Sequence, residues 1–90
     1  GKVIAFSGDT EWVEALIPAS DGADLYIAEC YAWDGPIRYH TSWEAMSANL
    51  ARITARRILL THMSHGMLKR TGEITDPRML LADDGLVVEV

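Results

Sequence analysis

Three short apolar runs, each followed by a polar residue, constrain the fold of this chain more than any other feature. The runs lie within the predicted strands 2–6, 25–28 and 57–60, of which the first begins at Lys2 and the third at Arg57. Asp9 follows the first run after a Ser-Gly pair, Glu29 follows the second, and His62 follows the third after a threonine. Runs this short, bounded by turn signals, are typical of buried strands, and α/β sheets bind ligands and metals beyond the carboxyl ends of their strands. The sequence therefore predicts an α/β domain with a site at one edge of the sheet.

Two helices are expected between these strands. The first begins with Asp9 or Thr10 as its N-cap, and Pro18 with Asp21-Gly22 ends it. The second begins at Thr41, because the spacing from Thr41 to Glu44 is that of a capping box. Both helices carry an apolar stripe and are expected to pack against the sheet.

The C-terminal segment is predicted to form a β-hairpin. Residues 79–82 and 86–90 are its expected strands, and Gly85 supports the turn between them. Ninety residues make one domain, so residues 1–90 are treated as a single unit. The apolar fraction of 49% is high for so small a body, which predicts that part of the surface faces a partner.

Charge and cysteine content narrow the possible functions. The net charge is −5 with only eight lysines and arginines, which argues against a general nucleic-acid surface. Cys30 is the single cysteine, so no intrachain disulfide is possible and a reduced, cytoplasmic location is expected. No run approaches the roughly 18 apolar residues of a membrane span. Cys30 itself is expected to be a small core residue rather than a nucleophile, because no base lies near it in the sequence.

Four separate strings resemble the C-terminal half of the metallo-β-lactamase fold hydrolases, most closely the tRNase Z (ribonuclease Z) and phosphodiesterase branch. They are Gly8-Asp9-Thr10, the strand-terminal Glu29, His40-Thr41 and Leu60-Thr61-His62. The resemblance covers essentially the whole chain. It implies half of an αββα sandwich, with a mixed sheet, two main helices and the C-terminal hairpin. It also implies that Asp9 and His62 bind metal, and that Glu29 and His40 form a catalytic dyad beside the leaving group.

The same resemblance indicates what the chain lacks. The family takes its first metal ligands from a His-x-His-x-Asp-His string, and the 90 residues contain no such string. The complete hydrolase is expected to hold two ions of zinc, or of manganese or iron, and to act on phosphodiester or related small ester substrates. This chain is expected to be its C-terminal half, inactive alone and without tightly bound metal. The expected partner is the missing N-terminal half or a second copy of the chain, so whether the chain is itself an enzyme stays open.

Each assignment has a structural alternative. Asp9 would serve only as a helix N-cap, Glu29 would pair with an arginine or cap the next turn, and His62 would be a hydrogen-bonded structural residue. Trp33, with Tyr31 and Tyr39 in the loop that leads to His40, either packs or lines a substrate pocket. At the level of function, the alternative is a non-catalytic α/β interaction module that self-associates through an exposed apolar face.

Overall fold

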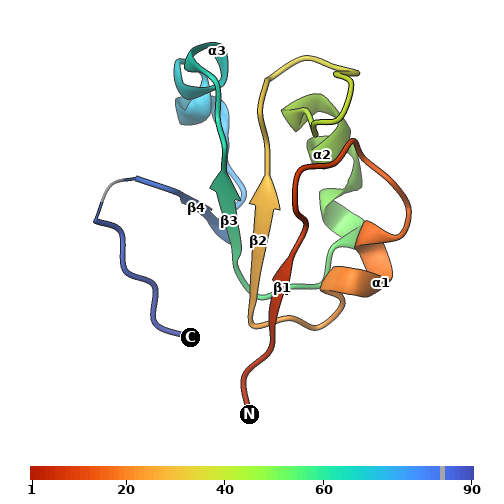
Figure 1. Cartoon of the computed structure of the whole chain (residues 1–90). Coiled ribbons are helices and arrows are strands. Elements are labelled where there is room, and N and C mark those ends of the chain that lie inside the picture. Colours follow the sequence, from red (N-terminus) through yellow and green to blue (C-terminus); the bar gives the residue numbers. More distant parts are fainter. Residues whose placement is uncertain (84) are drawn as a thin grey trace.

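The computed structural model, which describes residues 1–83 and 85–90, is built around one sheet of four strands (Figure 1). These are β1 (Ile4–Phe6), β2 (Leu25–Glu29), β3 (Ile58–Thr61) and β4 (Met79–Leu81), adjacent in that order. All three neighbouring pairs run parallel. The carboxyl ends of the strands therefore point to the same edge, as the sequence predicts for an α/β fold.

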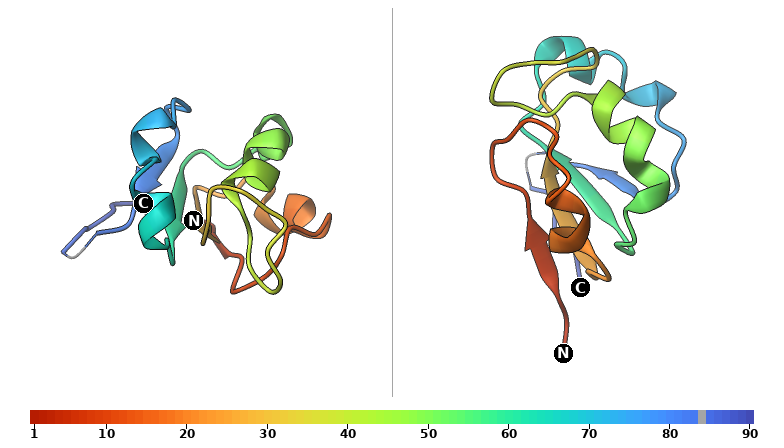
Figure 2. Two further views of the ribbon diagram at one scale, coloured as in Figure 1. Left: turned by 90° about the horizontal axis from the view of Figure 1, so that it is seen from above. Right: turned by 90° about the vertical axis from the view of Figure 1, so that its right-hand side faces the viewer.

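The helices are short and follow the strands. They are α1 (Leu16–Ser20), α2 (Trp43–Asn49) and α3 (His65–Leu68), with 3-10 turns η1 (Leu50–Arg52) and η2 (Thr71–Glu73). Figure 2 shows α1 and α2 on the same side of the sheet. The core lies between that side and the helices, where Tyr26 and Leu60 from the sheet join Met46 and Met67 from the helices. No helix within residues 1–83 and 85–90 has the length and apolar character needed to cross a bilayer.

The other face of the sheet carries a row of apolar side chains. Strand register aligns Phe6 with Ile27, Ile27 with Leu59, and Leu59 with Leu80. Side chains alternate between the faces of a strand, so this row, together with Ile4, lies opposite the helices. Ile4 is 58% exposed and Phe6 is 70% exposed. We call these five residues the open face.

The predicted mixed sheet and C-terminal hairpin are wrong. The sheet is parallel throughout the described residues, and residues 86–90 form no strand. Asp84, in the predicted turn, lies outside the described residues. The long connection through α3 and η2 brings β4 back parallel to β3, as parallel crossovers require. Because β4 has only three residues, it offers an antiparallel partner few hydrogen bonds, and Val87 in the tail stays 83% exposed.

Both predicted helix starts also need correction. Helix α1 begins at Leu16 rather than at Asp9 or Thr10, with Ala15 in the N-cap position. Pro18 lies in its first turn, where proline costs no intrahelical hydrogen bond, and the helix ends at Ser20, directly before Asp21-Gly22 as predicted. Helix α2 is capped by Ser42, one residue after the predicted Thr41, and the Ser42 side chain accepts the Ala45 N–H at 3.2 Å.

Candidate active site at the carboxyl edge of the sheet

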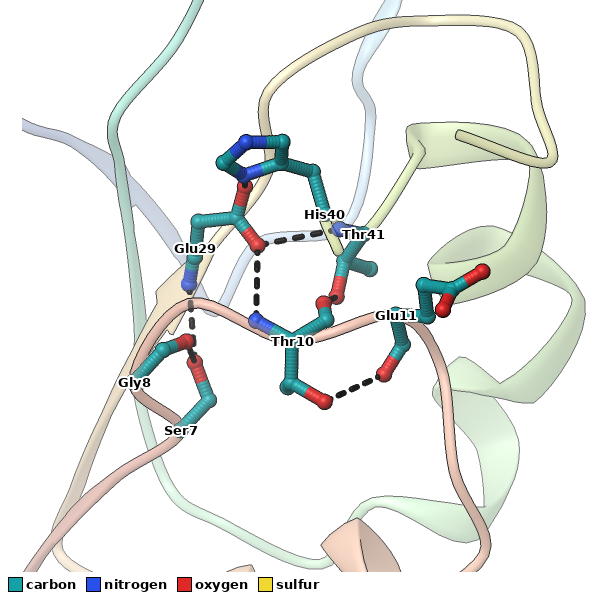
Figure 3. Close-up of polar contacts among 7 residues, drawn as sticks. All are labelled: Ser7, Gly8, Thr10, Glu11, Glu29, His40 and Thr41. Carbon is teal, nitrogen blue, oxygen red and sulfur yellow. Dashed lines mark hydrogen bonds and ion pairs between the residues drawn. The ribbon is translucent and has the colours of Figure 1, made fainter. Parts of the chain in front are cut away.

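A buried carboxylate at the end of β2 ties together the loops around the site (Figure 3). Glu29 is only 3% exposed. Its Oε2 accepts the backbone N–H of Thr41 at 2.9 Å and that of Thr10 at 3.4 Å. Its own N–H donates to Ser7 Oγ at 3.0 Å. The loops that follow β1 and β2 are therefore held by the same residue, in keeping with the turn-capping alternative; no arginine pairs with it among the described residues.

The second carboxylate oxygen holds the imidazole of His40. Nδ1 of His40 lies 2.7 Å from Oε1 of Glu29, and the His40 side chain is 28% exposed. A carboxylate accepts hydrogen bonds, so this contact places the hydrogen on Nδ1 and leaves Nε2 for another partner. The structure thus brings together the two residues predicted to form a dyad, although their catalytic role stays a prediction.

His62 comes to the same place from the end of β3. Its ring stacks on that of His40, with centroids 5.3 Å apart, and both rings contact Tyr31, at 5.5 Å from His62 and 4.9 Å from His40. His62 has a φ of 57°, in the left-handed region that is costly for a non-glycine residue and is concentrated at functional sites. We call Tyr31, His40 and His62 the ring cluster.

From the sequence, Tyr31 was considered only together with Trp33 and Tyr39, as part of an aromatic loop that either packs or lines a substrate pocket. Its N–H donates to the carbonyl of Thr41 at 2.9 Å, and its own carbonyl accepts the N–H of Ser64 at 2.7 Å. Tyr31 therefore links the two loops that carry the histidines through its backbone as well as its ring. The available signal was its position two residues beyond the strand-terminal Glu29, at the same sheet edge.

The donor atoms of the site can be compared with the needs of a metal ion. One ligand atom each from Glu29, His40 and His62 lies within 4.8 Å of the other two. Two ligands of one tetrahedral zinc ion would stand about 3.3 Å apart, given bond lengths of about 2.0 Å. The 2.7 Å between Glu29 and His40 is instead a hydrogen-bond distance. His62 has no hydrogen-bond partner among residues 1–83 and 85–90, so both nitrogens of its exposed imidazole are open to a metal ion, whereas His40 keeps only Nε2.

Asp9 lies apart from this group. It is exposed in the turn after β1, directly after Gly8, whose φ of 67° suits glycine. It does not join the group formed by Glu29, His40 and His62. The alternative that Asp9 is a helix N-cap is excluded, because α1 begins seven residues later. Its carboxylate has no hydrogen-bond partner in the described part of the chain, and its role as a metal ligand remains a prediction.

Cys30, next to Glu29, is a core residue, as expected. It is fully buried, and burial first, then the neighbouring carboxylate charge of Glu29, raises the pKa of its thiol to about 12. A thiol with this pKa is almost entirely protonated near neutral pH and is a poor nucleophile. His65 is exposed at the start of α3, outside the group around His62.

Comparison with known proteins identifies the fold to which this chain is similar. No protein-family model matches the sequence, and neither does any curated protein. Two solved structures match it closely in shape. A diphosphatase from the PhnP family has a TM-score of 0.80 at 21% identity, and the match covers 99% of this chain and 36% of that one. The metallo-β-lactamase fold protein YhfI from Bacillus subtilis has a TM-score of 0.76 at 24% identity, covering 96% and 39%. The chain thus spans well under half the length of these proteins, and it has the fold of one part of a metallo-β-lactamase fold protein.

Proposed function

We propose that this chain contributes half of the active site of a metal-dependent hydrolase that cleaves phosphodiesters or related esters. The observation that carries the proposal is the 2.7 Å hydrogen bond between Glu29 and His40, stacked beside His62 at the carboxyl edge of the sheet. The similarity in fold to a diphosphatase supports it. A buried carboxylate that orients an imidazole is a common arrangement for moving a proton to or from a substrate.

His40 and Glu29 have different roles in the proposed proton transfer. In its protonated form His40 carries a hydrogen on both ring nitrogens: it gives the one on Nε2 to the departing oxygen, while Glu29 accepts the one on Nδ1 and holds the ring in orientation. Solvent then returns a proton to Nε2. Glu29 is held by two backbone N–H groups, so it does not rotate away from the ring. This rigidity matters because a proton donor must stay within hydrogen-bond reach of the leaving group.

The donor set of the chain suits divalent transition metals. His62 offers an imidazole and Asp9 offers a carboxylate, and neither has a hydrogen-bond partner in residues 1–83 and 85–90. When bound, zinc, manganese or iron would act as a Lewis acid and activate water at neutral pH. We place the remaining ligands in the part of the fold that this chain does not span.

The open face is proposed to bind that remaining part, or else a second copy of the chain. An isolated sheet normally buries its apolar face against another layer, and here Phe6 and Ile4 stay mostly exposed. The same observation favours the second candidate function, a non-catalytic module that self-associates through this face. Light scattering and metal analysis of the purified chain separate the two: the module predicts a dimer that binds no metal.

Metal binding gives the first test. Titration of the chain with Mn²⁺, followed by NMR, should broaden the resonances of His62 first, because a paramagnetic ion relaxes the nuclei nearest to it. His62→Ala should abolish the effect. His65→Ala is the matched control, because His65 lies outside the group around His62 and should change nothing. Equal broadening in wild type and His62→Ala would contradict the metal assignment.

The leaving group gives the second test. In the assembled enzyme, His40→Ala should slow the hydrolysis of a methyl phosphodiester far more than that of a p-nitrophenyl phosphodiester, since p-nitrophenolate departs without a proton. The expected loss is about 10²–10⁴-fold for the methyl ester, the usual contribution of a positioned acid. Equal losses on both substrates would show that His40 does not protonate the leaving group.

A further inference from the structure

A hollow lies next to the ring cluster, between the loop after β2 and helix α3. It has a volume of about 260 Å³. Its walls include Trp33, Asp34, Ser64, Met67 and Arg70. The hydrogen bond from Ser64 N–H to the carbonyl of Tyr31 joins this hollow to the ring cluster. It therefore opens at the same sheet edge as the site already described.

Flat side chains form one wall. The guanidinium carbon of Arg70 lies 4.3 Å from the centre of the Trp33 ring. Trp33 in turn contacts Trp43, with ring centroids 5.9 Å apart, and so packs against the core. The Arg70 side chain is 43% exposed, so it is accessible to a ligand. Planar heterocycles stack on guanidinium groups as well as on aromatic rings, so this wall suits a flat ligand.

The charges of the hollow disfavour an anion. The charge of Arg70 is already matched by Glu73, which accepts from Nε at 2.8 Å and from Nη2 at 3.2 Å. Asp34 adds a second carboxylate, which has no hydrogen-bond partner among the described residues. A phosphate would meet a net negative charge here. A neutral ring that carries N–H donors would meet an acceptor.

We propose that this hollow binds the base of a nucleotide substrate, with guanine preferred. A 150 Å³ cavity holds a benzene ring, so about 260 Å³ suits a two-ring purine. Guanine presents two adjacent N–H donors to the two oxygens of the Asp34 carboxylate, whereas adenine presents one amino group. The proposal rests on the proposed function, because it directs the phosphate of that nucleotide toward the ring cluster.

Nucleoside binding tests the base site without any hydrolysis. Guanosine, adenosine and ribose 5-phosphate are each titrated into the ¹⁵N-labelled chain, and NMR shifts are read at the Trp33 indole and around Arg70. Guanosine should shift these signals and bind roughly tenfold more tightly than adenosine, the size expected for one good bidentate contact. Asp34→Asn should remove this preference. Asp34 is exposed, so the variant is expected to fold.

Matched variants provide the controls for this test, and several outcomes would overturn the proposal. Arg70→Met should weaken guanosine binding, whereas Arg52→Met, which breaks a comparable surface pair with Glu14, should not. Equal binding of both nucleosides, no binding of either, or an unchanged preference in Asp34→Asn would overturn the proposal. Shifts caused by ribose 5-phosphate alone would show an anion site and would overturn it too. Guanosine binding that persists in a protein without hydrolase activity would instead count against the proposed function alone.

Discussion

Replacing Glu29 by glutamine changes one atom of the site and should move a hydrogen on His40. The carboxylate accepts from His40 Nδ1 at one oxygen and from two backbone N–H groups at the other. In Glu29→Gln the amide oxygen must face the two N–H groups of Thr41 and Thr10, because an amino group there would place donors against donors. The new amino group then points at Nδ1 of His40. Nδ1 must become an acceptor, so the hydrogen moves to Nε2.

The expected loss of stability is small but measurable. A bond to a charged group contributes about 1.5–3 kcal/mol and a neutral bond about 1 kcal/mol. Thr41 N–H, at 2.9 Å, loses most of this charge assistance, whereas Thr10 N–H, at 3.4 Å, has little to lose. Relief from burying the charge offsets part of the loss. We expect a decrease of about 1 kcal/mol in the free energy of unfolding, or a Tm lower by roughly 4–8 °C for a chain of this size.

Two measurements check this reasoning. Nitrogen-15 NMR of the neutral imidazole should find the hydrogen on Nδ1 of His40 in the wild type and on Nε2 in Glu29→Gln, with His65 unchanged as the internal control. Urea unfolding gives the stability, and Glu29→Ala should lose about 3 kcal/mol because it leaves the buried N–H of Thr41 and the partly buried N–H of Thr10 without their acceptor and opens a cavity. The reasoning is refuted if the His40 hydrogen sits on the same nitrogen in both proteins.

Three further predictions follow from single contacts. The Cys30 thiol, buried and with its pKa raised to about 12, should react with a disulfide reagent only as the chain unfolds, so labelling and unfolding rates should agree; fast labelling of the native chain would contradict this. The hydrogen bond from Arg78 lowers the pKa of Asp76, so this pair stabilises the fold above the ordinary pKa near 4 and loses its effect as the pH falls through the lowered value. In Asp76→Asn, the free energy of unfolding should therefore fall less steeply as the pH is lowered from about 5 to 2, as measured by urea unfolding. Gly35→Ala would place a Cβ 2.7 Å from Cβ of Ser42, so we expect a lower Tm and shifted amide signals around the α2 N-cap, whereas Gly72→Ala, in open space, should have little effect.

The sequence predicted the strands well because each apolar run is short and ends in a polar residue. Leu25–Glu29 and Ile58–Thr61 lie within one residue of the predicted strands, since period and length carry that information locally. The helix starts were harder to predict. Thr41 has the composition of an N-cap, but its hydroxyl donates to the carbonyl of Thr10 and its N–H donates to Glu29, and both partners are distant in sequence. Local propensity could not detect a competing partner that only the folded chain supplies.

The site was predictable to the extent that strand ends converge. Parallel strands deliver Glu29 and His62 to one edge whatever the loops do, so their proximity follows from topology. The contact between Glu29 and His40 also depends on the path of the loop over residues 30–40. The central place of Tyr31 depends on hydrogen bonds from both sides of that edge. Neither feature has a local sequence pattern. Only the resemblance suggested the contact between Glu29 and His40, and the sequence offered Tyr31 only as one of three aromatic residues in that loop.

The buried carboxylate of Glu29 has two tasks that a truncation removes together. One oxygen secures the backbone of two loops, and the other orients His40. Because the same side chain does both, Glu29→Ala would free the imidazole and also loosen the loops that place it beside His62. The conservative Glu29→Gln change is therefore the informative one, because it keeps the backbone contacts while reversing the polarity toward the ring. A variant of His40 tests the reverse case, since its loss leaves the backbone acceptor of Glu29 intact and should reduce proton transfer with little cost to the fold.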